Sequence, residues 1–135
     1  MKTFDTQAAE IQCDHRRAFY YIADPKNLPE WTHAFKSATP GSALMETPQG
    51  SVPVKLTVDS SADHGTIDWL IEFPDGSRTT AFSRLIDAGN NRSIYTFTLI
   101  PPPVPLERIE GALEQQSLIL REELQTLARI LGSRK

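Results

Sequence analysis

Apolar and polar residues alternate with a period of two through the middle of the chain, which is the pattern of β-strands. In residues 52–58 every second side chain is aliphatic, and residues 67–73 repeat the rule with Ile, Trp, Ile and Phe. Residues 77–87 and 92–100 predict two further strands, and turn sequences rich in Gly, Pro, Asn and Asp separate these segments. Because one face of each segment is apolar, the pattern predicts an antiparallel sheet with one buried face and one wet face.

The first third of the chain begins with a different pattern. Residues 2–13 predict a first strand, and Asp14 follows where a helix N-cap belongs, since its carboxylate can accept from the free N–H groups of the first turn. Apolar residues at helical spacing then predict a short helix, which Pro25 ends because the residue before a proline avoids the α region. Residues 27–35 predict a second short helix with Pro29 in its first turn.

The end of the chain predicts one long helix. The segment PPPVP, residues 101–105, cannot donate to a sheet and ends it. Leucine and isoleucine then recur at spacings of three and four, which predicts a helix over residues 106–132, roughly 40 Å long. One polar position, Gln116 or Ser117, interrupts the apolar stripe, and the pair Glu122–Glu123 is expected on the solvated face.

The predicted order is a strand, two short helices, about six strands and one long helix. An antiparallel sheet with one wet face must bury its other face, and the last helix is the only predicted element long enough to cover it. No repeat or domain boundary interrupts the pattern, so residues 1–135 are expected to form a single domain.

Composition narrows the class of protein. The chain has 39% hydrophobic and 23% charged residues, a globular balance. The net charge is −3 without a basic block, so no nucleic-acid partner is expected. Cys13 is the only cysteine, and neither metal-ligand spacing nor a cofactor motif is present, so we expect no disulfide, metal or cofactor. Without an apolar leader or an apolar run near the roughly 20 residues that span a bilayer, the chain is expected to be cytoplasmic, with no transmembrane segment.

One motif carries a resemblance to a known family. Residues 11–31 read I-x-C-D-H-R-R-A-F-x-x-I-A-D-P-x-N-L-P-x-W, and together with the element order they resemble the START-like superfamily, also called SRPBCC. This superfamily includes polyketide cyclase/dehydratase-like and birch-pollen-allergen-like proteins. The residues that carry the resemblance are Ile11, Phe19, Ile22, Asp24, Pro25, Leu28, Pro29 and Trp31. Asp14 stands where family members commonly have a proline, which exchanges one helix-starting residue for another.

The resemblance implies an α+β helix-grip fold, with a curved antiparallel sheet of about seven strands around the long C-terminal helix. It also implies a deep, mostly apolar cavity for a hydrophobic or amphipathic small molecule. The candidate ligand-binding residues at such a cavity are Tyr20, Trp31, His33, Phe35, Trp69, Phe73, Arg84, Tyr95, Phe97, Leu113 and Gln116.

Several of these candidates have two interpretations. Trp69 and Phe73 either line the cavity or are ordinary core, and the Tyr95 hydroxyl needs either a backbone carbonyl or a ligand as its partner. If the Arg84 side chain points inward, it binds an anionic group. If Ala81, Ser83 and Leu85 point inward instead, Arg84 is solvated. These alternatives depend on which face of each strand is buried.

The entrance of the cavity raises a separate question. Trp31 is expected to be a structural plug, and Tyr20, His33 and Phe35 are the expected ligand contacts beside it. His33 is either a surface residue or an acid–base group near neutral pH. If Trp31 is buried with no cavity beside it, this end of the chain serves packing rather than binding.

Three functions fit this sequence. The first is a binding protein for a hydrophobic ligand such as a lipid, isoprenoid, polyketide or aromatic compound. The second is an enzyme of the polyketide cyclase/dehydratase type, whose acid–base group would be Arg84, Tyr95 or His33; the sequence assigns no catalytic residue. The third is a protein–protein interaction module, with a homodimer as one form.

Overall fold

The computed structural model describes the backbone of residues 4–47, 50–100 and 106–133. Side chains are described for the same ranges, apart from residue 47, residues 106–115 and residue 133. The prediction for the PPPVP segment therefore falls outside the described residues, as does the side chain of Leu113.

The fold is α+β, and the order of its elements is the predicted one. A seven-stranded sheet has the order β1-β7-β6-β5-β4-β3-β2, with every neighbouring pair antiparallel. The elements are β1 (Asp5–Ile11), α1 (His15–Ala23), the 3-10 helix η1 (Pro25–Asn27), α2 (Leu28–Trp31), β2 (Phe35–Thr39), β3 (Ser42–Thr47), β4 (Gly50–Ser61), β5 (Thr66–Glu72), β6 (Arg78–Asp87), β7 (Ser93–Leu99) and α3 (Leu106–Ser133).

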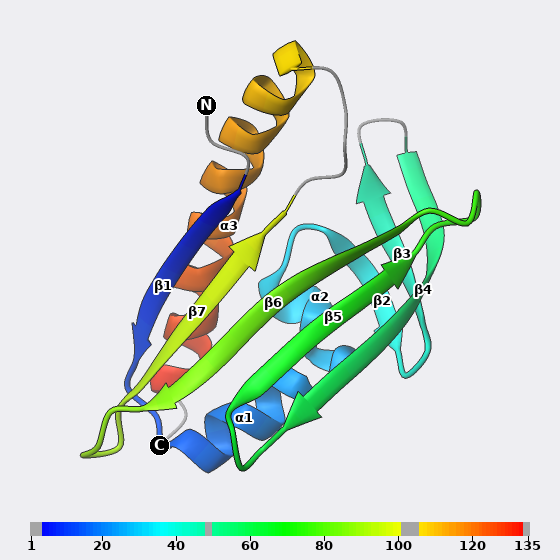
Figure 1. Ribbon diagram of the computed structural model, residues 1–135. Coiled ribbons are helices and arrows are strands. Elements are labelled where there is room, and N and C mark those ends of the chain that lie inside the picture. Colours follow the sequence, from blue (N-terminus) through cyan, green and yellow to red (C-terminus); the bar gives the residue numbers. More distant parts are fainter. Residues whose placement is uncertain (1–3, 48–49, 101–105, 134–135) are drawn as a thin grey trace.

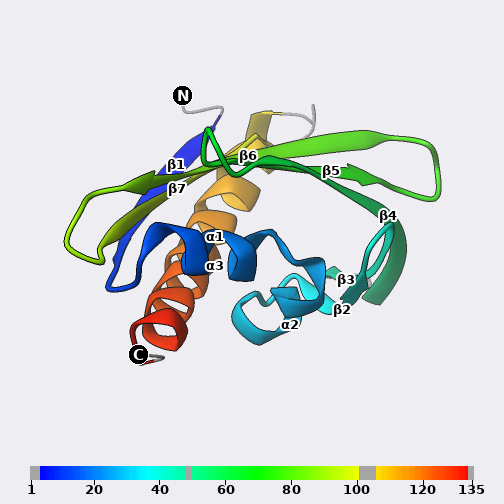
Figure 2. The ribbon, with the colours of Figure 1, turned by 90° about the horizontal axis from the view of Figure 1, so that it is seen from below.

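The sheet curves around the helices, and all of them lie on its concave side (Figure 1). Seen from below, the strands arch over α1, α2 and α3, with α3 beneath β1 and β7 and α2 beneath the far end of the arch (Figure 2). This arrangement confirms the helix-grip fold that the sequence predicts.

Local chemistry fixes the two short helices. The Asp14 carboxylate accepts a hydrogen bond from the backbone N–H of Arg17 at 3.1 Å, so Asp14 is the N-cap of α1. The helix ends at Ala23, before Pro25, as predicted. Helix α2 is shorter than predicted and ends at Trp31. The backbone at Thr32 is extended, which turns the next N–H groups away from the helix.

The turn between β4 and β5 fits closely against β6. Gly65 has a φ of +71°, and a Cβ atom there would lie 2.2 Å from the carbonyl oxygen of Leu85. The same oxygen lies 2.9 Å from Nε2 of His15, the first residue of α1. Glycine at position 65 therefore allows the turn, β6 and α1 to meet at this end of the sheet.

The buried face of the sheet is the predicted one. Val54, Leu56, Ile67, Trp69, Ile71, Leu85 and Tyr95 are buried on the concave side. From α3 the buried leucines are Leu120, Leu124, Leu127 and Leu131, spaced by three and four as expected. One core therefore joins the concave face of the sheet to the second half of α3.

Candidate functional site

Tyr95 lies on the concave face, on strand β7 next to the edge strand β1, and is fully buried. Its ring meets Trp31 of α2 with centroids 6.3 Å apart and Phe97, two residues along β7, also at 6.3 Å. Trp69 of β5 is buried on the same face and pairs with Ala81 of β6. Four of the predicted ligand-binding residues thus form one aromatic group, which we call the aromatic cluster: Trp31, Trp69, Tyr95 and Phe97.

Three polar atoms of the aromatic cluster are buried, and no described residue forms a hydrogen bond with them. They are Nε1 of Trp31, Nε1 of Trp69 and the hydroxyl oxygen of Tyr95. Indole N–H groups and phenol hydroxyls normally find a partner when they are buried, because an unsatisfied buried donor retains its desolvation penalty. This is the most unusual polar feature of the described interior.

The surroundings of the Tyr95 hydroxyl show why it stays unsatisfied. Ser83 and the Trp69 indole are close enough to lower the pKa of Tyr95 in part, but neither reaches hydrogen-bond geometry. The Ser83 hydroxyl instead donates to the carbonyl oxygen of Ile67 at 2.5 Å. Burial outweighs both effects and raises the pKa of Tyr95 far above its ordinary value. Tyr95 is therefore a neutral phenol that can donate a proton in a hydrogen bond.

Half-buried apolar side chains extend the concave face beyond the closed core. They come from β2, β3, β4, β6, β7 and the residue after β5, and they pack against the core while remaining partly accessible. Phe35 pairs with Met45 across β2 and β3, and Met45 pairs with Val52 across β3 and β4. The half-buried residues, called the apolar rim here, are Phe35, Met45, Val52, Phe73, Ala81, Phe97 and Leu99. The predicted candidates Phe35, Phe73 and Phe97 belong to this rim.

Arg84 lies on the outer face of the sheet. Its alternate neighbours Ser83 and Leu85 are buried, whereas Phe82 and Ile86, which share its face, are exposed. The outward alternative for Arg84 is therefore confirmed, and the side chain does not point into the interior.

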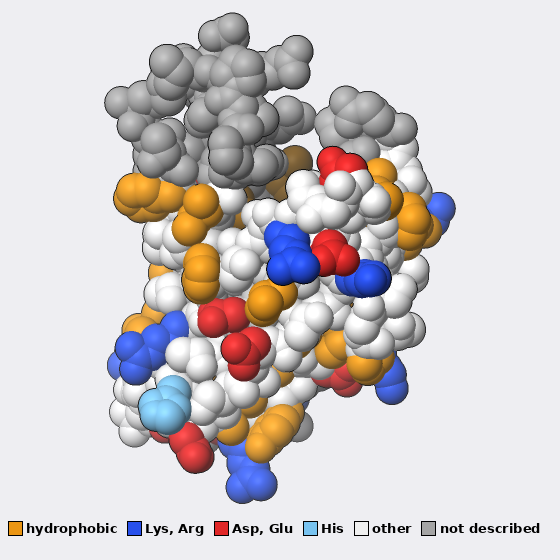
Figure 3. All heavy atoms as spheres, turned by 45° about the vertical axis from the view of Figure 1, so that its right-hand side comes forward, with side chains coloured by type: hydrophobic (Ala, Val, Ile, Leu, Met, Phe, Trp, Pro, Cys, Tyr) orange, Lys and Arg blue, Asp and Glu red, His pale blue; other side chains and the backbone are white. Residues whose placement is uncertain are grey.

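Figure 3 shows hydrophobic side chains in small separate groups among charged and other polar ones on one side of the molecule.

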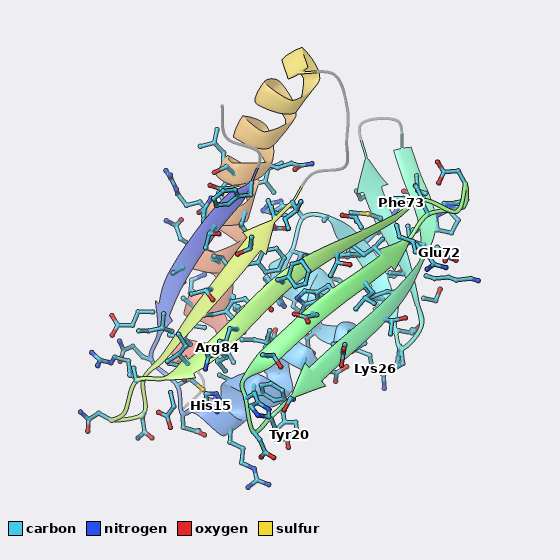
Figure 4. All side chains as sticks on the ribbon, in the orientation of Figure 1. His15, Tyr20, Lys26, Glu72, Phe73 and Arg84 are labelled. Carbon is cyan, nitrogen blue, oxygen red and sulfur yellow. The ribbon has the colours of Figure 1, made fainter. Side chains whose placement is uncertain are left out.

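Tyr20 and His33 do not reach the aromatic cluster. Tyr20 is 57% exposed, and the Arg16 guanidinium carbon lies 6.0 Å from the centre of its ring. Figure 4 shows Tyr20 on α1, far from Phe73, which lies near the opposite end of the sheet. The His33 side chain is 59% exposed, with Nε2 3.9 Å from a carboxylate oxygen of Glu122. The surface interpretation of His33 is the one that its exposure supports.

Glu123 was expected on the solvated helix face, and that expectation is wrong. Its exposed fraction is 8%, and its Oε2 accepts hydrogen bonds from the backbone N–H groups of His33 at 2.6 Å and Ala34 at 3.4 Å. Burial raises the pKa of the Glu123 carboxyl, and these two N–H donors offset only part of that rise. The connection between α2 and β2 lies over α3 and covers Glu123, a long-range contact that helical periodicity does not show.

The polar interruption of the α3 stripe is Ser117 rather than Gln116. Gln116 is exposed, so its inclusion among the cavity residues has no support from its position. The Ser117 hydroxyl donates to Oδ2 of Asp5 at 2.8 Å, and Nε2 of Gln7 donates to the same carboxylate oxygen at 2.9 Å. Gln7 also lies 2.6 Å from the carbonyl oxygen of Ser117. Side chains of β1 therefore satisfy this position of α3.

Two open hollows lie on the surface away from the aromatic cluster. One, of about 410 Å³, is lined by Asp14, His15, Arg16, Asp87, Gly89, Asn90 and Asn91. The other, of about 200 Å³, lies on the sheet and is lined by Lys55, Thr57, Leu70, Ile71, Glu72, Arg78, Thr79 and Thr80.

No group of three or more His, Cys, Asp or Glu side chains in the described ranges could hold a metal ion. Among the helices described, none is both long and apolar enough to cross a membrane.

Comparison with known proteins identifies the fold. No protein-family model matches the chain, and no curated protein matches it. Among solved structures, XoxI from Bacillus cereus has a TM-score of 0.72 at 14% identity, covering 98% of this chain and 97% of that one. The Zhui aromatase/cyclase from Streptomyces sp. R1128 has a TM-score of 0.68 at 8% identity, with 97% and 94% covered. A START superfamily protein from Mycobacterium smegmatis has a TM-score of 0.66 at 11% identity, with 95% and 98% covered.

These similarities establish the fold of the chain. Over nearly its whole length it shares the helix-grip architecture of the START superfamily protein and the aromatase/cyclase. Identities of 8 to 14% show the fold alone, and a fold of this kind hosts more than one function. The function must therefore be argued from the aromatic cluster and the apolar rim.

Proposed function

We propose that this protein binds a hydrophobic or amphipathic small molecule on the concave face of its sheet, between the apolar rim and the aromatic cluster. The observation that carries the proposal is the continuity of that face. Buried Trp69 pairs directly with half-buried Ala81, so the closed core and the partly accessible rim adjoin on this face. Burial of a ligand on such a surface contributes roughly 25 cal/mol per Å² before ordering costs.

The cluster and the rim have separate roles in this proposal. Rim residues from five strands and from the residue after β5 supply apolar contact from several directions, while the donors of Trp31, Trp69 and Tyr95 are the polar groups that orient a ligand. Trp31 remains the predicted plug, because it is buried and packs edge-on against Tyr95. Since neither described hollow is lined by Trp31, its end of the chain is assigned to packing, and the ligand contacts are expected at Phe73, Ala81 and Phe97 rather than at Tyr20 and His33.

A cyclase-type enzyme is the second candidate, and the shared fold with an aromatase/cyclase favours considering it. The Tyr95 hydroxyl and the Trp69 N–H could polarise a carbonyl group, but a cyclase also needs a base. Among the described residues the buried carboxylates are Asp5 and Glu123, and both hold hydrogen bonds outside the aromatic cluster. Binding is therefore the function that the described interior supports best.

A substitution that fills the face tests the proposal. Ala81→Phe adds a ring between Trp69 and Leu99 on the concave side, and Thr80→Phe adds the same ring on the outer face of the same strand. Titration with N-phenyl-1-naphthylamine, an uncharged probe that fluoresces in apolar surroundings, is expected to give saturable binding in the wild type and in Thr80→Phe. Ala81→Phe is expected to weaken binding at least about tenfold at an overpacking cost of about 1–3 kcal/mol.

Two results would contradict the proposal. One is a wild-type protein that shows no saturable probe binding. The other is an Ala81→Phe variant that remains folded by circular dichroism and binds the probe as well as the wild type does. Native mass spectrometry of protein purified from its own cells adds an independent measurement, since a retained small molecule would identify the ligand.

A further inference from the structure

The three unsatisfied donors of the aromatic cluster carry information about the ligand. Two of them, the indole N–H groups of Trp31 and Trp69, can only donate. The third, the Tyr95 hydroxyl, is held in its neutral form by burial, so it too has a proton to donate. A ligand that satisfies this set must present a hydrogen-bond acceptor, and a pure hydrocarbon would leave all three donors unpaired.

Two of the donors can serve the same acceptor atom. The Trp69 indole and the Ser83 hydroxyl both lie near the Tyr95 hydroxyl. The Ser83 proton is already donated to the carbonyl oxygen of Ile67. Neither the Tyr95 hydroxyl nor the Trp69 N–H makes a hydrogen bond of good geometry with a described residue, and a carbonyl oxygen, with its two lone pairs, accepts two hydrogen bonds at once.

The charge of the described interior disfavours an acidic ligand group. The buried polar and charged side chains described in the structure are Asp5, Ser83, Ser93 and Glu123, with no cation among them. Arg84, a candidate cation for this role, lies on the outer face. A carboxylate or phosphate next to Tyr95 would be buried without a counter-charge, which is costly. A neutral oxygen acceptor carries no such penalty.

We infer that the ligand is a neutral carbonyl compound, such as a ketone or quinone on an apolar ring system, whose oxygen accepts hydrogen bonds from Tyr95 and Trp69. This inference rests on the proposed binding function and specifies the ligand class of the same face. The apolar body of the ligand contacts the rim at Ala81 and Phe97, and the carbonyl group points toward β5 and β7. Tyr95 acts as a binding and orienting group in this arrangement.

A matched set of probes tests the inference. Fluorene, 9-fluorenone and fluorene-9-carboxylate share one tricyclic frame and differ in having no acceptor, a neutral acceptor and an anionic acceptor. Isothermal titration calorimetry is expected to show that 9-fluorenone binds the wild type at least about tenfold tighter than fluorene, with the carboxylate weakest. The Tyr95→Phe and Trp69→Phe variants are expected to bring 9-fluorenone within about threefold of fluorene.

Controls separate hydrogen bonding from damage to the fold. Tyr21→Phe removes a hydroxyl that donates to Glu30 outside the cluster and should keep the preference for 9-fluorenone. Tyr95→Phe removes a single oxygen atom from a fully buried ring, so it carries the test if Trp69→Phe does not fold. The ¹³C resonance of the bound 9-fluorenone carbonyl should move downfield of its position in an apolar solvent, and Tyr95→Phe should reduce that shift.

The possible outcomes distinguish this inference from the binding function beneath it. Equal affinity for fluorene and 9-fluorenone in the wild type, or an unchanged preference in both variants, overturns the carbonyl inference and leaves the binding function standing. Tightest binding of the carboxylate overturns it in favour of an anionic ligand. If none of the three compounds binds, the binding function fails for ligands of this size, and the carbonyl inference fails with it.

Discussion

The indole ring of Trp31 stands edge-on against the phenol ring of Tyr95, with centroids 6.3 Å apart and ring planes at 85°. This contact joins helix α2 to strand β7, the neighbour of the edge strand β1, and both residues are buried. Replacing Trp31 with alanine is expected to cost about 3–5 kcal/mol of unfolding free energy, because a large buried ring is lost and a cavity remains. Urea unfolding followed by circular dichroism measures the loss.

A double-mutant cycle isolates the ring contact. Trp31→Leu and Tyr95→Leu, alone and together, are expected to show a coupling energy of about 0.5–1.5 kcal/mol. Additive effects of the two substitutions would mean that the edge-on contact contributes nothing beyond burial. In that case Trp31 would be a plug only through its volume.

Tyr95 is expected to make the protein sensitive to alkali. An unfolded tyrosine ionises at a pH of about 10, whereas burial raises the pKa of folded Tyr95 far above that value. As the pH rises past about 10, the unfolded state therefore loses a proton that the folded state keeps. Unfolding becomes more favourable with rising pH, so stability that is present below pH 10 is lost above it.

Tyr95→Phe tests this dependence directly. The variant should lose less stability than the wild type between about pH 9 and pH 11, and at neutral pH it should be as stable or more stable, because an unsatisfied hydroxyl is removed. Urea unfolding at several pH values measures both effects, and all other titrating groups are common to the two proteins. Parallel pH profiles would show that the Tyr95 hydroxyl is not desolvated in solution.

Glu123 is expected to set a second pH dependence, at acidic pH. An unfolded glutamate ionises at a pH of about 4.3, and burial raises the pKa of folded Glu123 above its ordinary value. Between these two values the unfolded state has lost a proton that the folded state still holds. The contribution of Glu123 to stability is thus complete below about pH 4 and declines as the pH rises through the raised pKa.

Three variants at this position separate charge from hydrogen bonding. Glu123→Gln keeps an acceptor for the N–H groups of His33 and Ala34, so its stability relative to the wild type should increase from about pH 4 to pH 7. Glu123→Ala removes the acceptor and should cost about 1–3 kcal/mol. Glu122→Gln, at the exposed neighbouring position, should change stability by less than about 0.5 kcal/mol. Thermal unfolding across this pH range measures all three, and identical profiles for Glu122→Gln and Glu123→Gln would contradict the prediction.

Features that depend on neighbouring residues in the chain could be predicted from the sequence. The period of two placed Ile67, Trp69 and Ile71 on the buried face, and the structure confirms it because strand geometry alone determines which side chains share a face. Asp14 and Pro25 set the bounds of α1 through their own backbone chemistry, which is equally local.

Features that depend on distant contacts could not be predicted in the same way. β6 has apolar residues on both faces, so alternation alone left the direction of Arg84 open until the register with β5 and β7 was known. Glu123 has the same local pattern as Glu122, and only the crossing of the α2–β2 connection over α3 distinguishes them. Trp31, Trp69 and Tyr95 lie on three separate elements. No local pattern in the sequence therefore shows that their buried polar atoms lack hydrogen-bond partners.

Ser117 offers a test of how α3 is held against the sheet. Its hydroxyl donates to the buried carboxylate of Asp5, which also accepts from Gln7, so Ser117→Ala leaves a buried acceptor with one donor fewer. The expected cost is about 1–3 kcal/mol, while Gln116→Ala at the exposed adjacent position should cost less than about 0.5 kcal/mol. Hydrogen exchange should show faster opening of β1 in Ser117→Ala, because the hydrogen bonds of Asp5 and Gln7 with Ser117 hold this edge strand against α3. Equal, small effects of the two substitutions would mean that apolar packing alone holds α3 in place.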